Sequence, residues 1–156
     1  VVLAGRPASD RRSFVDNELA NYRVIGSHGD LVDEAWRRER FSRIFDWGHN
    51  AAGLGRQTMA IVATGDRTAS LASVVAPTLV VHGAADTLVA PSGGEATARA
   101  IPGAELLVVP DLGHEIPPAS WPLVVGAIVA NARRADARRA DVRRAEAGAV
   151  GSGGSR

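Results

Sequence analysis

Cysteine and long apolar runs are both missing from this sequence. With no cysteine among 156 residues, disulfide bonds, thiolate metal sites and cysteine nucleophiles are excluded together. No apolar run approaches the roughly 20 residues that a membrane-spanning helix needs. The opening V-V-L-A-G-R-P has neither the charged segment nor the apolar core of a signal peptide. We therefore expect a cytoplasmic location.

An excess of charge of one sign is missing too. Lys and Arg number 18 and Asp and Glu 17, a formal net charge of +1, so the composition does not indicate a nucleic-acid or membrane partner. The four histidines include no His-x-x-x-His pair, so no zinc site is predicted. The glycines lack the following G-K-S/T of a phosphate cradle. With 46% hydrophobic residues, the length fits one domain, and we expect neither a metal nor an organic cofactor.

The most informative stretch covers residues 76–117. It contains two short apolar runs, T-L-V-V-H-G and E-L-L-V-V, each bounded by Pro or Gly. Such runs are typical of strands buried on both faces. Residues 91–101 between them are long enough for one crossover helix. This order predicts an α/β fold with a right-handed βαβ unit and parallel strands.

Each predicted strand leads into a loop that carries a polar residue suited to chemistry. Asp86 follows the first strand and His114 the second, so both should lie at the carboxyl edge of one sheet, where open α/β sheets bind ligands. A carboxylate that accepts the Nδ1 proton of an imidazole fixes its tautomer and leaves the other ring nitrogen free as a base. We expect a carboxylate oxygen within about 4 Å of a ring nitrogen. The alternative is a turn-forming Asp86 and a loop histidine without chemistry.

Four helices are predicted before this stretch and one after it. The first has Ser9 or Asp10 as its N-cap, carries an apolar face at helical spacing, and ends at Gly26. The last begins near Ser120, with Pro122 in its first turn. The earlier helices are expected over residues 10–25, 31–46, 54–63 and 66–75.

The second predicted helix is rich in arginine. Arg37, Arg38, Arg40 and Arg43 lie largely away from its apolar side chains. We interpret them as a solvated face; the alternative is an anion-binding role.

After residue 133 the sequence becomes a five-residue repeat, R-R-A-D-A, R-R-A-D-V, R-R-A-E-A. Five residues do not match a helical turn, so the charges wind around every side and leave no face to bury. We expect this tail to contribute nothing to the fold, and residues 148–156 to be a flexible end. The chain then divides into a helical region (1–75), an α/β part (76–134) and a charged tail (135–156).

The two loops resemble those of the α/β-hydrolase family. P-T-L-V-V-H-G-A-A-D looks like the strand and loop that deliver the triad acid, and P-D-L-G-H like the loop that delivers the triad histidine. The resemblance implies the C-terminal part of an α/β-hydrolase: a helical cap, the last βαβ unit and a C-terminal helix, with an incomplete sheet. It implies that Asp86 and His114 are catalytic, and that His82 is structural.

The helical region is similar to the cap of one hydrolase group, the anthracycline methylesterases and related bacterial proteins. F-V-D-N, I-G-S-H-G, D-E-A-W-R-R, F-D-W-G-H-N-A-A-G-L-G-R-Q and A-T-G-D-R carry this resemblance, which covers roughly residues 6–130. It implies that the cap roofs the active site and selects a small ester-like substrate. Trp36, Phe41 and Phe45 are then expected to bind substrate; packing in the core is the alternative.

One requirement of this family is absent. No serine stands in a G-x-S-x-G turn, and the segment that supplies the oxyanion hole is missing too. A parallel sheet of two strands cannot bury itself. We therefore expect a fragment of a longer esterase-like enzyme, inactive alone, which associates with the missing half or with itself through the exposed sheet. The alternative is a catalytically inactive remnant that acts as an interaction module.

Overall fold

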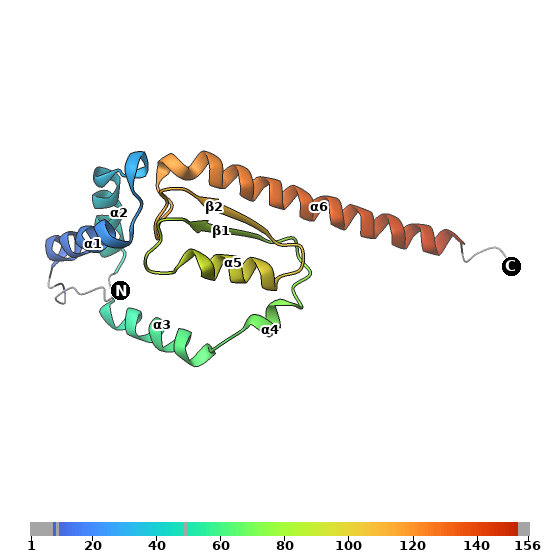
Figure 1. Ribbon diagram of the computed structural model, residues 1–156, viewed down its shortest axis with the longest axis horizontal. Coiled ribbons are helices and arrows are strands. Elements are labelled where there is room, and N and C mark those ends of the chain that lie inside the picture. The colour runs from blue at the N-terminus through green and yellow to red at the C-terminus, as the bar shows by residue number, and fades with distance from the viewer. Residues whose placement is uncertain (1–7, 9, 49, 153–156) are drawn as a thin grey trace.

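The computed structural model describes residues 8, 10–48 and 50–152. A small parallel sheet lies at the centre, with α5 on one side and the long helix α6 on the other (Figure 1). Helices α1 and α2 pack together beyond one end of the sheet, and α3 and α4 form an arch that returns the chain to the first strand (Figure 1). This is a partial α/β fold, in which helices predominate over a two-stranded sheet.

The helical pair α1 and α2 has its own apolar core. Helix α1 covers Arg11–Ile25, and its N-cap Asp10 accepts a hydrogen bond from the Ser13 amide at 2.8 Å; Ser9 lies outside the described residues. Helix α2 covers Glu34–Asp46 and begins three residues later than predicted. The later start follows from Asp33, which caps α2 by accepting a hydrogen bond from the Trp36 amide at 2.8 Å. A short 3₁₀ helix, η1 (Gly29–Leu31), precedes the cap.

The next two helices differ from their predicted lengths in opposite directions. Helix α3 covers Ala51–Thr64 and is longer than predicted at both ends, since Asn50 caps its first turn. Helix α4 is a single turn, Thr68–Leu71, where residues 66–75 were predicted to be helical. Met59, Ile61 and Val62 of α3 are largely exposed, so these three apolar side chains have little cover from the described residues.

The predicted βαβ unit is present. Strand β1 (Leu79–Gly83) is followed by α5 (Pro91–Ala100) and β2 (Glu105–Val109). The strands pair in parallel, with Val81 opposite Leu107. Because parallel strands end at the same edge, the loops after β1 and β2 lie side by side.

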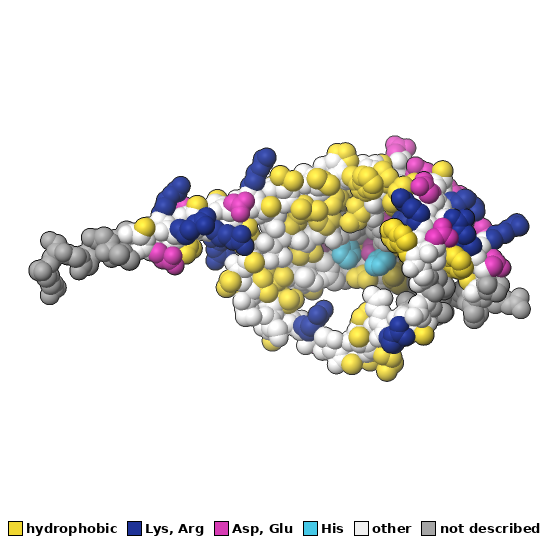
Figure 2. Space-filling model, turned by 180° about the vertical axis from the view of Figure 1, so that it is seen from behind, with side chains coloured by type: hydrophobic (Ala, Val, Ile, Leu, Met, Phe, Trp, Pro, Cys, Tyr) yellow, Lys and Arg dark blue, Asp and Glu magenta, His cyan; other side chains and the backbone are white. Residues whose placement is uncertain are grey.

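The prediction that both strands are buried on both faces is wrong for this chain. Leu106 and Val108 of β2 retain 38% and 39% of their accessible surface. The sheet of the described residues has only two strands, so one helix on each side cannot cover it. Figure 2 shows hydrophobic side chains gathered over the part of the molecule from which the C-terminal helix projects. Exposed residues of that helix include Leu123, Val125, Ile128 and Val129.

Helix α6 is one continuous element. It covers Trp121–Ser152 after a 3₁₀ turn, η2, at Pro118–Ser120, so the segment 148–152, predicted to be flexible, is helical; residues 153–156 lie outside the described part. Arg134 forms an ion pair with Glu105 of β2, and Arg138 donates to the Val75 carbonyl oxygen. The prediction that the segment from about residue 133 contributes nothing to the fold is therefore wrong for its first five residues or so, a little more than one helical turn. No helix within the described residues has both the length and the apolar character needed to cross a membrane.

Because of these contacts, the part of the tail that can be deleted without loss of stability is expected to begin later than residue 133. Deleting residues 144–156 should change the free energy of unfolding by less than about 0.5 kcal/mol, because residues 144–147 are exposed. Deleting residues 134–156 should cost about 1 kcal/mol or more, because it removes the contacts of Arg134 and Arg138. Urea denaturation of both deletions measures the difference. Equal stability of the two would contradict this boundary.

Candidate functional site

The loops after β1 and β2 are bonded to each other through their backbones. The Ala84 amide donates to the Val109 carbonyl oxygen at 2.9 Å, and the Ala85 amide donates to that of Leu112 at 2.9 Å. A side chain at Gly83 would overlap the Leu112 carbonyl oxygen, so this approach requires glycine. The glycine of H-G-A-A-D thus allows the two loops to meet.

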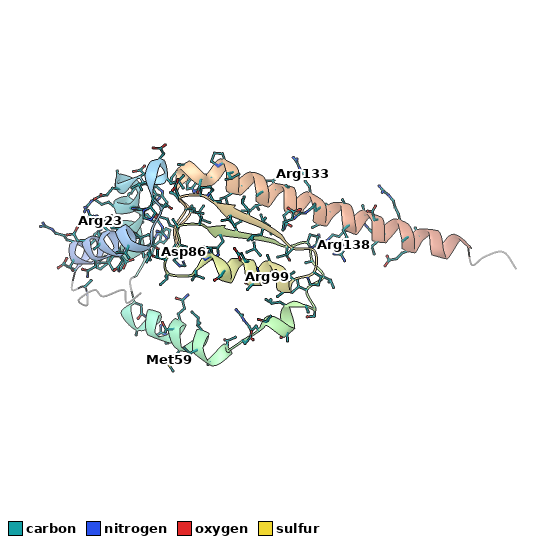
Figure 3. All side chains as sticks on the ribbon, in the orientation of Figure 1. Arg23, Met59, Asp86, Arg99, Arg133 and Arg138 are labelled. Carbon is teal, nitrogen blue, oxygen red and sulfur yellow. The ribbon has the colours of Figure 1, made fainter. Side chains whose placement is uncertain are left out.

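This contact brings Asp86 and His114 together. Oδ2 of Asp86 lies 2.8 Å from Nδ1 of His114, within the expected limit and at the carboxyl ends of the strands (Figure 3). The Asp86 side chain is 7% exposed, whereas that of His114 is 40% exposed. Nε2 of His114 has no hydrogen-bond partner among the described residues. The pair therefore has the arrangement of a carboxylate-oriented imidazole whose second nitrogen is open to a reactant.

The surroundings of Asp86 favour its ionised form. Burial alone raises the pKa of this carboxyl, but hydrogen bonds from the Val89 amide, from His114 and from the Leu88 amide together hold the pKa below its usual value. Both amides donate to Oδ1 at 2.9 Å, which leaves Oδ2 for the imidazole. Asp86 is thus fixed as an acceptor that can stabilise an imidazolium.

A cavity of about 330 Å³ opens at this pair. Its walls include apolar side chains and the backbone of the histidine loop; the lining residues include Val81, Val89, Leu112 and Ile116. In Figure 2, histidine side chains are visible on the surface beside a hollow. No group of three or more His, Asp or Glu side chains in the described part of the chain could hold a metal ion. The cavity offers apolar walls and one base, a setting for a small organic substrate.

His82 lines the same cavity but is held by the backbone. Its Nε2 lies 2.9 Å from the Val89 carbonyl oxygen, and its ring packs so closely on Gly94 of α5 that a Cβ there would overlap it. His82 therefore connects β1 to the loop that carries Asp86. This placement supports the structural role expected for it.

Trp36, Phe41 and Phe45, which were expected to bind substrate, do not line this cavity. Phe41 is 1% exposed and packs on Tyr22. Phe45 packs on Phe14, and the ring of Trp36 lies beside the Arg40 guanidinium. The structure thus places Phe41 and Phe45 in the core between α1 and α2, which was the alternative to substrate binding, and it does not bring Trp36 to Asp86 and His114.

One cluster beside the site was missed by the sequence analysis. Arg37, interpreted as part of a solvated face, is buried and forms an ion pair with Glu115, the residue after His114. Oε1 of Glu115 also accepts from the Ser27 amide at 3.0 Å. A signal was present in the sequence, since Arg37 precedes Phe41 by four residues and so lies on the buried side of its helix.

The end of α1 rests directly on the histidine loop. The His114 amide donates to the Ile25 carbonyl oxygen at 2.7 Å, and the Gly113 amide donates to Ser27 Oγ at 3.1 Å. A Cβ at Gly113 would overlap the backbone of Gly26. At Gly113 and Gly26 the two segments therefore meet backbone against backbone.

Comparisons with known proteins are consistent with this partial fold. No family model matches the sequence. The chain is similar to the structure of Rv0554 from Mycobacterium tuberculosis, with 22% identity and a TM-score of 0.50, over 86% of this chain and 53% of that one. It is also similar to Est816, described as an N-acyl homoserine lactone degrading enzyme, with 25% identity and a TM-score of 0.43, over 65% of this chain and 40% of that one. The chain thus spans about half the length of these structures or less, and the likeness concerns the fold.

The lowered pKa of Asp86 predicts how stability depends on pH. Asp86→Asn should cost about 1–2 kcal/mol at pH 7, because it weakens a charge-assisted hydrogen bond. Since the folded pKa lies below the unfolded value of about 3.9, this contribution is present above pH 4 and is lost as the pH falls through the folded pKa. Urea unfolding of both proteins between pH 7 and pH 3 should show the difference between their free energies of unfolding becoming smaller at the acid end. A difference that grows on acidification below pH 4 would contradict a lowered pKa for Asp86.

The backbone contact of His82 predicts a loss of stability without a loss of the Asp86–His114 pair. His82→Gln should lower the free energy of unfolding by about 1–2 kcal/mol, because a packed ring and its hydrogen bond are replaced. The Nδ1 proton signal of His114 should persist in the NMR spectrum of the variant. Its disappearance in a folded variant would show that His82 belongs to the reactive group.

Proposed function

We propose that this chain supplies the acid and the histidine of a Ser-His-Asp hydrolase that acts on a small ester-like substrate. The observation that carries the proposal is the 2.8 Å contact of Asp86 Oδ2 with His114 Nδ1. This contact leaves Nε2 of His114 without a hydrogen-bond partner from the described residues, at the cavity lined in part by Val81, Val89 and Ile116. The partial α/β fold and the carboxyl-edge location of the pair support the same reading.

In the proposed reaction His114 acts as the base and Asp86 holds it in place. Nε2 takes the proton of a serine hydroxyl while the serine oxygen bonds to the ester carbonyl carbon. The imidazolium, stabilised by Asp86, then gives its proton to the alcohol oxygen as the bond between that oxygen and the carbonyl carbon breaks, which leaves the acyl-serine. Water next bonds to the acyl carbon while Nε2 takes its proton. The bond to the serine oxygen then breaks, the acid leaves, and the imidazolium returns the proton to the serine oxygen.

The serine of this reaction is not one of those near the site. Ser27 is buried, and its Oγ accepts the hydrogen bond from the Gly113 amide. Ser120 is buried as well, and its Oγ donates to the Pro117 carbonyl oxygen. Because no serine of the sequence stands in a G-x-S-x-G turn either, the proposed enzyme would take the nucleophile and the oxyanion donors from a segment outside this sequence.

We infer that this segment docks on the incomplete sheet. In the described part of the chain, each strand of the two-stranded sheet has an unpaired outer edge, and Leu106 and Val108 are exposed beside it. An unpaired edge is a template for a further strand. A nucleophile-bearing part of an α/β domain, either in the same polypeptide or in a second chain, would pair with the edge and cover the apolar face. Self-association through this surface is the competing outcome.

A non-catalytic interaction module is the second candidate. The exposed apolar side chains of α3, among them Met59 (Figure 3), favour it, because an uncovered apolar helix suits a partner surface. The two candidates differ in whether His114 governs turnover once the missing groups are present.

The first activity prediction concerns the chain alone. Without nucleophile and oxyanion donors, the 156-residue chain should hydrolyse an activated ester such as p-nitrophenyl acetate no faster than the same concentration of free imidazole. Hydrolases that have lost a triad residue still accelerate the reaction roughly 10³- to 10⁴-fold over the reaction in water, and this residual acceleration relies on an oxyanion hole and on substrate binding. Saturable turnover that His114→Ala abolishes would reveal a nucleophile within this chain.

The second activity prediction concerns the completed sheet. A separately produced N-terminal half of an α/β-hydrolase of this fold, added in trans, should restore ester hydrolysis if the halves assemble. His114→Ala should then reduce kcat by at least about 10³-fold, whereas the matched control His28→Ala, which changes an exposed histidine, should not. Assembly by size-exclusion chromatography without any His114-dependent rate would favour the interaction module.

A further inference from the structure

Glu115 is an unusual neighbour for the proposed base. Its side chain has no accessible surface, and that of Arg37 is 5% exposed. Oε1 of Glu115 accepts from Arg37 Nε at 2.9 Å, from Arg37 Nη2 and from the Ser27 amide at 3.0 Å. A carboxylate and a guanidinium are thus buried together immediately after His114.

Stability alone does not account for this pair. Burying two charges costs several kcal/mol of desolvation per ion, and well-packed apolar residues in their place are often equally or more stable. What the pair supplies is a fixed orientation of the backbone segments that it joins. The planar guanidinium has several donors in fixed positions, and here Nη2 also donates to the Ser27 carbonyl oxygen at 3.0 Å. One side chain of α2 therefore holds both the histidine loop and the segment after α1.

Three consecutive residues of the histidine loop are bonded to two residues at the end of α1 and just after it, Ile25 and Ser27. Gly113 is bonded to Ser27, the His114 amide to Ile25, and the Glu115 carboxylate to the Ser27 amide. Arg37 closes this set from α2. The backbone on both sides of His114 is thereby fixed, and with it the direction in which the imidazole leaves the chain.

We propose that Arg37 and Glu115 are positioning residues for His114. Their buried ion pair locks residues 113–115 onto residues 25–27, so that Nδ1 of His114 remains on Asp86 and the cap moves together with the base. This inference rests on the proposed role of His114, but it concerns the orientation of the ring and can be tested on the chain by itself.

The probe is the His114 imidazole, observed by ¹⁵N-edited NMR on the full 156-residue chain. The Asp86 contact predicts a single tautomer with its proton on Nδ1 and a slowly exchanging, low-field proton signal. The double variant Arg37→Met with Glu115→Met removes both charges and leaves neither ion unpaired. In that variant the Nδ1 proton should exchange about tenfold faster or more, as expected when a charge-assisted hydrogen bond is weakened, and both tautomers should appear.

Arg37→Lys tests geometry at constant charge. Lysine keeps a positive charge but lacks the fork that reaches Glu115 and Ser27 together, so exchange should again be faster than in the unsubstituted protein. Asp46→Asn is the matched control, because it breaks the exposed ion pair of Asp46 with Arg11, which links the same two helices away from the loop. It should leave the His114 signal unchanged.

The outcomes separate this inference from the proposed function. If Asp86→Asn leaves the His114 signal unchanged, the proposed base pair is absent and the function proposal fails. If Asp86→Asn removes the signal while the folded double variant retains it at the original exchange rate, the positioning role is overturned and the function proposal stands. If the double variant does not fold, Arg37→Lys and Glu115→Gln test the positioning role in its place. An unchanged exchange rate of the His114 Nδ1 proton in both variants overturns that role, and faster exchange supports it.

Discussion

The parallel pairing of β1 with β2 is the constraint on which the rest of this structure depends. Because the two strands run in the same direction, the loops that follow them meet at one edge. Asp86 and His114 belong to different loops, and no local structure could bring their side chains to 2.8 Å. The crossover helix α5 closes the unit, and Gly83 allows the loops to touch. The parallel direction of the strands therefore determines where the candidate site lies, and the side chains of Asp86 and His114 determine its chemistry.

The helical pair α1 and α2 is joined to this site by close packing that leaves little room for relative movement. Gly26 and Gly113 meet backbone to backbone, and the buried pair of Arg37 with Glu115 lies beside them. Protein interiors packed in this way transmit displacement, because they cannot compress. A shift of α2 would consequently displace His114. This packing therefore couples the helices expected to select a substrate to the residue proposed to act on it.

The uncovered surfaces of the molecule follow from the same sheet. Two strands with one helix on each side leave apolar side chains of β2 and α6 in contact with solvent. Surface of this kind on an α/β element is ordinarily covered by neighbouring strands and helices. Under the function proposed above, a further α/β segment would bring the nucleophile and cover this surface.

Local patterns in the sequence determined much of the framework. Apolar runs bounded by Pro and Gly predicted both strands, and the residues between them predicted α5, because strand and helix signals depend on neighbours along the chain. The same reasoning placed Asp86 and His114 at one edge. The four-residue spacing of Arg37 from Phe41 indicated the buried side of the helix, but the partner of Arg37 could not be found this way, since Glu115 lies 78 residues away. Tertiary structure also decided that Phe41 packs in the cap core and that the strands stay partly exposed, because burial depends on which elements are present to cover a side chain.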